Sequence, residues 1–182
     1  MVALNTEHNH AATQPTKAQR WTFFAVVSLG LLMIGLDNSI LYTALPALAE
    51  QLHTTSTQQL WIINAYALVL AGLLLGTGTL GDRIGHRRMF VSGLFLFGGA
   101  SLAAALAPSA WFLVGARALL GLGAAVMMPA TLALIRLTFD DEIERNTAIG
   151  IWGSVAVVGA AAGPTVGGFL LEHFWWGSVF LI

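Results

Sequence analysis

The sequence predicts an all-α integral membrane protein, and three observations carry that prediction. Hydrophobic residues make up 57% of the 182 residues and charged residues only 9%, against roughly 25% charged residues in a typical soluble domain. The mean hydropathy is +0.76. The apolar residues gather in runs of about 20 residues, the length that an α-helix needs to cross a bilayer. We therefore expect a bundle of membrane-spanning helices.

Five complete spans and the start of a sixth follow one another along the chain, joined by short polar segments. The third apolar run is the shortest and is rich in glycine, so its ends are the least defined. The chain ends at Ile182 inside the sixth run, and we therefore expect it to be a fragment or a truncated product of a longer protein. The expected spans are residues 21–41, 60–80, 89–106, 111–135 and 147–171, with the sixth starting near residue 174.

The basic residues indicate the orientation of the bundle. Seven of the eight Lys and Arg residues precede the first span or lie in alternate loops, and the other loops carry none. Basic loops are retained in the cytoplasm, so we expect a cytoplasmic N-terminus. Residues 1–20 are polar and without periodicity, which predicts a disordered cytoplasmic tail. The seven residues are Lys17, Arg20, Arg83, Arg87, Arg88, Arg136 and Arg145.

The same composition argues against several other classes of protein. The chain has no cysteine for a disulfide or a thiolate metal site, its histidines are dispersed, and its net charge of −1 without a basic block argues against nucleic-acid binding. A signal peptide is the alternative for the first run, because small residues at 47–49 resemble a cleavage site. Asp37 interrupts that run and the run is long for a signal peptide, which favours a retained span.

A glycine-rich segment with one proline lies in the fifth apolar run. Gly159, Gly163 and Gly167 recur every four residues, so they share one helical face and leave a groove that another helix can enter. Pro164 donates no backbone hydrogen bond and clashes with the carbonyl group of Ala160, which predicts a kink. The segment is either a conformational element or a packing surface alone.

Four segments carry recognisable motifs: residues 36–46 in the first span, 78–88 between the second and third spans, 113–125 in the fourth span and 159–168 in the fifth. Together and in this order they resemble the N-terminal half of a major facilitator superfamily drug:proton antiporter. The chain is most similar to the fourteen-span branch, and within it to exporters of methyl viologen and quaternary ammonium compounds. The resemblance implies the N-terminal six-helix half of a major facilitator fold, truncated in the sixth span.

The motif between the second and third spans combines glycines, which permit a tight turn, with charges at the membrane surface. A simple positive anchor explains the arginines but not Asp82 or the glycine spacing. The resemblance implies that Asp82 contacts a helix of the second half of the transporter, which this chain lacks. His86 stands where the resemblance leads us to expect a fixed basic residue, so one charge there depends on pH. The loop-motif residues are Gly78, Asp82, Arg83, Gly85 and Arg87, and the antiporter-motif residues are Gly159, Gly163, Pro164, Gly167 and Gly168.

Asp37 and Arg117 are the charges expected at membrane depth. Each costs about 2.5–3.5 kcal/mol near the centre of an inserted helix, so each needs a partner or water. An apolar environment disfavours the ionised carboxylate, which suits a reversible proton carrier. We assign both residues to proton coupling, and a static ion pair that only fixes helix packing is the alternative. Leu120 stands where the resemblance leads us to expect glutamine, so the polar network around Arg117 should be thin.

Aromatic and methionine side chains could offer polarisable surfaces to a lipophilic cation. Each of them also has an ordinary interpretation, because aromatic residues form belts at the membrane interface and methionine fills gaps in helix packing. The candidates for lining a substrate pathway are Tyr42, Trp61, Tyr66, Met128 and Trp152.

The function that the resemblance implies is secondary active multidrug efflux, exchanging hydrophobic or quaternary ammonium cations for protons. The proton gradient is the energy source, with no cofactor, no metal site and no enzymatic activity, in a bacterial plasma (inner) membrane. The glycine–proline motif favours export, because symporters of this superfamily generally lack it. Two alternatives stay open: another transporter of the superfamily, such as a symporter or metabolite exporter, and an inactive N-terminal fragment.

Overall fold

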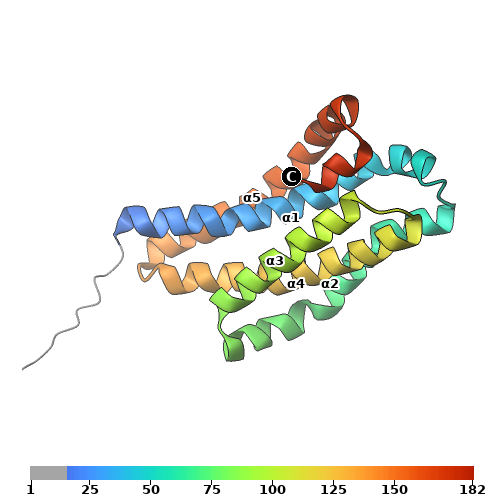
Figure 1. Ribbon diagram of the computed structural model, residues 1–182. Coiled ribbons are helices and arrows are strands. Elements are labelled where there is room, and N and C mark those ends of the chain that lie inside the picture. Colours follow the sequence, from blue (N-terminus) through green and yellow to red (C-terminus); the bar gives the residue numbers. More distant parts are fainter. Residues whose placement is uncertain (1–15) are drawn as a thin grey trace, which may run out of the picture.

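The computed structural model describes residues 16–182, and every element of secondary structure in this part of the chain is a helix (Figure 1). Five of its helices are long and apolar enough to cross a membrane, which confirms the predicted all-α class. The helices are α1 (Lys17–Gln51), α2 (Ser56–Ile84), α3 (His86–Ala105), α4 (Ala110–Thr138), α5 (Glu142–His173) and the short 3₁₀ helix η1 (Trp176–Phe180).

Helix α1 begins inside the region that was predicted to be a disordered tail. Thr16 caps the helix by accepting a hydrogen bond from the backbone of Gln19, while the Gln19 side chain accepts one from the backbone of Thr16. This reciprocal capping box satisfies two of the N–H groups that a helix start leaves unpaired. The predicted tail boundary at residue 20 was therefore wrong. The prediction for residues 1–15 lies outside the described residues.

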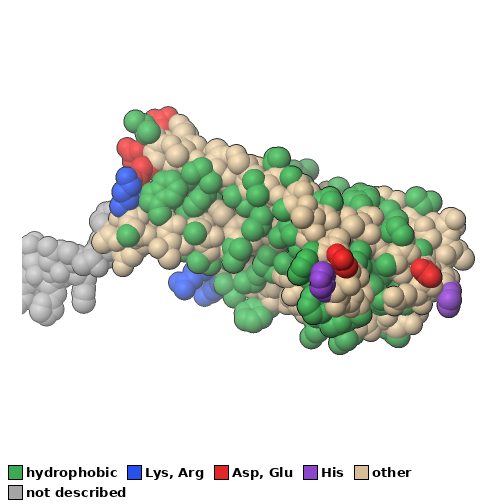
Figure 2. All heavy atoms as spheres, turned by 90° about the horizontal axis from the view of Figure 1, so that it is seen from above, with side chains coloured by type: hydrophobic (Ala, Val, Ile, Leu, Met, Phe, Trp, Pro, Cys, Tyr) green, Lys and Arg blue, Asp and Glu red, His purple; other side chains and the backbone are tan. Residues whose placement is uncertain are grey.

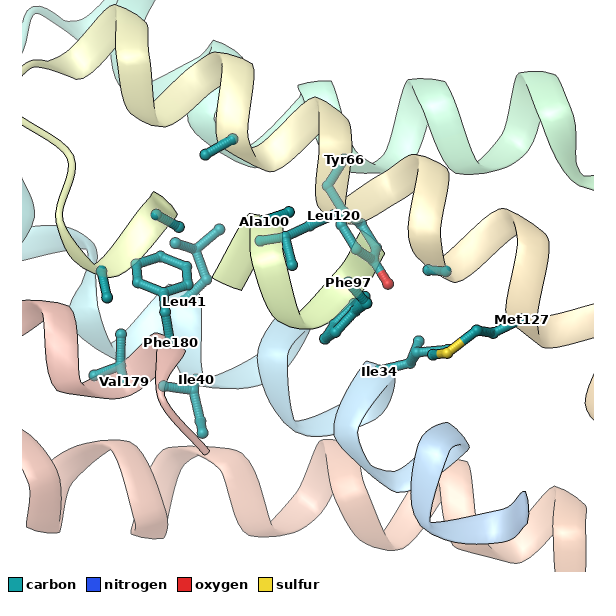
Figure 3. Packing of buried hydrophobic residues seen from close by; sticks show 14 of the residues in the cluster. Ile34, Ile40, Leu41, Tyr66, Phe97, Ala100, Leu120, Met127, Val179 and Phe180 are labelled. Atoms are coloured by element: carbon teal, nitrogen blue, oxygen red, sulfur yellow. The ribbon is translucent and has the colours of Figure 1, made fainter. Parts of the chain in front are cut away.

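The predicted start of a sixth span is a five-residue 3₁₀ helix that folds onto α1, α3 and α5. Val179 and Phe180 are buried in the main core, as Figure 3 shows. Gly177 allows this fold because a Cβ atom there would collide with the carbonyl group of Ala105 at the end of α3. Burial of these side chains holds the segment against the bundle.

The helices form two packing groups. Helix α1 lies along α5, while α4 packs closely against both α2 and α3, and the two groups meet mainly where α1 crosses α4. Figure 1 shows α1 beside α5 and α4 between α2 and α3. On the face seen in Figure 2, charged side chains gather toward the two ends of the molecule and leave a largely apolar middle. This distribution matches a bundle that crosses a bilayer.

The turn between α2 and α3 depends on one glycine. Gly85 has φ +101° and ψ 127°, a conformation that side chains with a Cβ atom rarely adopt. Its N–H group donates to the carbonyl oxygen of Gly81 at 2.9 Å, the last bond of the α2 pattern, and its positive φ then ends the helix. Gly78 lies inside α2, about two turns earlier, so the prediction that it helps form the tight turn was wrong.

We expect Gly85→Ala to lower the stability of the bundle by about 1–3 kcal/mol, because the turn would then hold a strained backbone. The measurement is thermal unfolding of the detergent-solubilised protein. Gly76→Ala is the matched control, since a Cβ atom there would meet nothing within 4 Å and alanine is the better helix former. Equal unfolding temperatures for the two variants would contradict the assigned role of Gly85.

Candidate functional site: a buried ion pair between α1 and α4

The two charges expected at membrane depth contact each other inside the bundle. Arg117 on α4 donates from Nη1 to Asp37 Oδ2 on α1 at 2.6 Å. Arg117 is completely buried, and Asp37 is 8% exposed. Breaking a buried pair by removing one partner typically costs 3–5 kcal/mol, because the remaining charge is left uncompensated. The pair therefore links the two packing groups where they cross.

Helix α2 supplies the other contacts of Arg117. The Nε atom donates to the carbonyl oxygen of Ile62 at 3.2 Å, and the guanidinium carbon lies 4.6 Å from the centre of the Tyr66 ring. Nη2 of Arg117 and the hydroxyl of Tyr66 are buried and have no hydrogen-bond partner among the described residues. Leu120 is fully buried one turn away from Arg117 and offers it no hydrogen bond. The polar network around Arg117 is therefore thin, as the leucine at this position predicted.

Asp37 lines a small cavity. Its volume is about 10 Å³, close to the smallest space that holds one water molecule. The lining includes the hydroxyl-bearing Ser101 and the ring of Phe97 on α3, and Phe180 on η1. Asp37 therefore has a charged partner and also borders a space that can hold a water-sized molecule.

The glycine face of α5 packs directly on α1, as its four-residue spacing predicted. A Cβ atom at Gly159 would lie 2.9 Å from the carbonyl oxygen of Leu32, and one at Gly163 would fall on the hydroxyl of Ser39. The same Ser39 hydroxyl lies 3.3 Å from the carbonyl oxygen of Gly159, to which it donates. Gly167 continues this face against Ile40. The missing side chains thus let the two helix backbones approach closely.

The other two residues of the antiporter motif point away from that interface. Pro164 is exposed, and a Cβ atom at Gly168 would meet nothing within 4 Å. Helix α5 continues through Pro164 without a break. The motif therefore has a packing side, formed by three glycines, and an outer side that carries the proline.

The charges of the loop motif lie on the surface at one end of the bundle. Asp82 Oδ1 is 3.3 Å from His86 Nε2 one turn later, and the Asp82 side chain is largely exposed. The His86 ring fits against α2 because Gly81 has no side chain. Arg83 and Arg87 are exposed. A surface ion pair of this kind contributes little to stability. Because its side chain is also largely exposed, Asp82 is accessible to another partner.

An apolar groove of about 460 Å³ runs beside the loop motif. Trp152 of α5 and Met128 of α4 line it together with Gly78 and Asp82 of α2. The indole N–H of Trp152 donates to the hydroxyl of Thr131 at 3.0 Å, which fixes the orientation of the ring. Two of the five predicted substrate-lining residues thus share one surface.

The other three predicted lining residues lie elsewhere. Tyr42 and Trp61 are exposed, at 57% and 44%, and neither lines this groove. Tyr66 is only 2% exposed, and Figure 3 shows its side chain directed into the core with the hydroxyl toward Phe97. Its ring is occupied by Arg117 and is not an open surface for a ligand in this conformation.

Sequence reasoning missed three partners of these residues. Ser39 lies within the first motif, so its hydroxyl was a detectable signal. Thr131 stands without a motif, and the Ile62 contact uses a backbone carbonyl that no side-chain pattern reveals. Residues 16–182 contain no group of three or more His, Cys, Asp or Glu side chains placed to hold a metal ion.

The known proteins that this chain resembles include efflux, resistance and export proteins. The chain is 51% identical over 171 residues to the multidrug efflux pump LfrA of Mycolicibacterium smegmatis, covering 94% of this chain and 34% of that protein. It is 48% identical over 164 residues to the methyl viologen resistance protein SmvA of Salmonella typhimurium, covering 90% and 33%. It is 39% identical over 173 residues to the tetracenomycin C resistance and export protein of Streptomyces glaucescens, covering 95% and 32%.

The chain spans about a third of the length of these relatives. The model of the Major Facilitator Superfamily matches residues 27–182, which include all five long helices except the first residues of α1. This is a family of membrane transporters and not of enzymes. On the strength of this match and of the identity to LfrA and SmvA, the chain belongs to the major facilitator superfamily.

Proposed function

We propose that this chain is the N-terminal part of a secondary active exporter that exchanges hydrophobic or quaternary ammonium cations for protons. The observation that carries the proposal is the buried pair of Asp37 and Arg117, a single carboxylate and its counter-ion at membrane depth. The names of the multidrug and methyl viologen relatives support a lipophilic cation as the exchanged solute.

The exchange of a cation for a proton follows because the single negative charge of Asp37 can balance either a bound proton or a bound cation, but not both. Proton uptake neutralises Asp37 and removes its attraction for Arg117. An organic cation that binds near the protonated Asp37 favours release of its proton, and a proton that binds to Asp37 favours release of the cation. The apolar surroundings make this competition strong, because charges interact more strongly where water is excluded.

The groove beside Met128 and Trp152 supplies a surface for the cation. Its lining offers a methionine sulfur and an aromatic ring, both of which attract large polarisable cations. Asp82 at the same groove adds a negative charge. In the complete transporter a second half would face this surface, since facilitator-type pathways lie between two halves.

We further propose that the Arg-rich end of the bundle faces the bacterial cytoplasm. Arg83, Arg87 and Arg88 cluster where α2 meets α3, and Arg136 lies at the end of α4 nearest α5. Positively charged loops of this length remain on the cytoplasmic side of the plasma membrane. A cysteine in place of the exposed Arg87, in the first turn of α3, should react with a membrane-impermeant thiol reagent in inverted vesicles and not in intact cells.

The proposed function is tested by transport in inverted membrane vesicles that contain the complete transporter. We expect a proton gradient to drive accumulation of ethidium and methyl viologen, and we expect a protonophore to abolish it. Residues 1–182 expressed alone serve as a control and should show no transport. Transport that persists after the proton gradient is collapsed would overturn the proposal.

Another transporter of the superfamily is the competing function, and the same vesicles distinguish it. A symporter would take up its solute in the direction of proton movement, and a metabolite exporter would prefer neutral or anionic solutes over quaternary ammonium compounds. The glycine–proline motif of α5 favours the antiporter, because symporters of the superfamily that the chain resembles generally lack this motif. The glycines of the motif pack closely on α1.

A further inference from the structure

Arg117 is held by both packing groups, but unequally. Among the described residues, its one hydrogen bond to the α1/α5 group is with Asp37, whereas α2 supplies both the carbonyl oxygen of Ile62 and the ring of Tyr66. Helix α4, which carries Arg117, itself packs mainly on α2 and α3. If the Asp37 contact is lost, the guanidinium therefore keeps two partners in its own group.

The position of the Tyr66 ring is fixed by a close backbone contact. Gly121 lies one turn after Arg117 on α4, and a Cβ atom there would lie 3.1 Å from the Cα atom of Tyr66 and would collide with its carbonyl oxygen. The missing side chain lets α2 and α4 approach at this level. The backbone of Tyr66 is consequently fixed beside α4, and its ring, buried with the whole residue 2% exposed, lies over Arg117.

We propose that Tyr66 is a positioning residue of proton exchange, whose ring retains Arg117 on α2 when Asp37 is neutralised. The inference rests on the proposed function and deepens it. An aromatic face attracts a cation and repels an anion, so it interacts weakly with the intact ion pair and strongly with the guanidinium alone. The ring thereby stabilises the protonated form of Asp37 relative to the ionised form.

The arrangement also separates proton uptake from disruption of the core. When Asp37 takes up a proton, the polar link between α1 and α4 weakens, while Arg117 remains stacked on Tyr66 and bonded to Ile62. Among the described residues, Arg117 and Tyr66 are the charged or titratable groups that face Asp37. Helix α3 and η1 present Phe97, Ser101 and Phe180, and the charged residues of α5 lie at its two ends.

The test measures proton release from the purified complete transporter when tetraphenylphosphonium is added, across a series of pH values. Release falls as pH rises past the value at which Asp37 is already ionised. For Tyr66→Leu we expect this midpoint to move about one pH unit lower, in line with the size of a desolvated cation–π contact. Tyr66→Phe keeps the ring and should restore the wild-type midpoint.

Two further variants keep the result independent of folding. Tyr66→Met also removes the ring but leaves an unbranched, flexible side chain that can fill the gap in a different way from leucine, and it should move the midpoint in the same direction as Tyr66→Leu. Phe139→Leu removes an equally buried ring from the separate cluster around Phe24 and Ile135, so it should reduce the yield of folded protein and leave the midpoint in place.

A wild-type midpoint in both Tyr66→Leu and Tyr66→Met would overturn the inference while leaving the proposed function intact. An equal shift in Tyr66→Phe would also overturn it, because the hydroxyl and not the ring would then be responsible. If the wild type releases no proton when the cation is added, the proposed exchange itself fails, and this outcome is distinct from the other two.

Discussion

Asp37→Asn in the complete transporter is expected to reduce proton-driven efflux of ethidium to the level of cells without the transporter. The amide has the size of the carboxylate and its oxygen can still accept a hydrogen bond from Arg117, so the helix contact at 2.6 Å can persist. What is lost is the group that takes up and releases the proton. The measurement is efflux from energised cells, normalised to the amount of inserted protein.

Two controls separate loss of coupling from loss of folding. Glu50→Gln makes the same chemical change at the exposed end of α1 and should leave efflux intact. Asp37→Asn combined with Arg117→Leu removes both charges, and should recover stability lost to an unpaired cation without recovering efflux. Undiminished efflux by the single Asn variant at matched expression would show that the ion pair has a packing role alone.

The positions of the long helices could be predicted from the sequence, but the residues at which they begin and end could not. Apolar runs of membrane length predicted all five long helices, because burial in lipid demands continuous hydrophobicity. The ends depend instead on single hydrogen bonds, such as those by which Thr16, Thr55 and Asp141 cap α1, α2 and α5. These caps extend each helix beyond its apolar run, into polar residues that hydropathy assigns to loops.

In the candidate site, too, some features could be predicted from the sequence and others could not. The cost of burying a charge predicted that Asp37 and Arg117 each need a partner or water, with an ion pair between them as one alternative. The four-residue glycine spacing predicted a close helix contact. The position of Tyr66 could not be predicted. It depends on the rotation of α2 about its axis, which the backbone contact at Gly121 determines only once the helices are packed.

Gly163→Leu is expected to lower both the amount of folded protein and its transport activity. A side chain at this position would fall on the Ser39 hydroxyl and lie 3.0 Å from the backbone nitrogen of Ile40, and this backbone cannot move without separating α1 from α5. Overpacking of this kind typically costs 1–3 kcal/mol. Gly153→Leu on the same helix is the matched control, since a Cβ atom there would meet nothing within 4 Å.

Pro164→Ala should act differently, because Pro164 is on the exposed side of α5 and touches none of that packing. Alanine restores a backbone donor toward Ala160 and favours a straight helix. If the motif changes conformation during transport, this variant should be as abundant as wild type yet slow or uncoupled in inverted vesicles driven by a proton gradient. If the motif is a packing surface alone, the variant should transport normally and be neutral or slightly more stable. Full activity in Pro164→Ala beside an inactive Gly163→Leu would therefore assign the whole motif to the contact between α5 and α1.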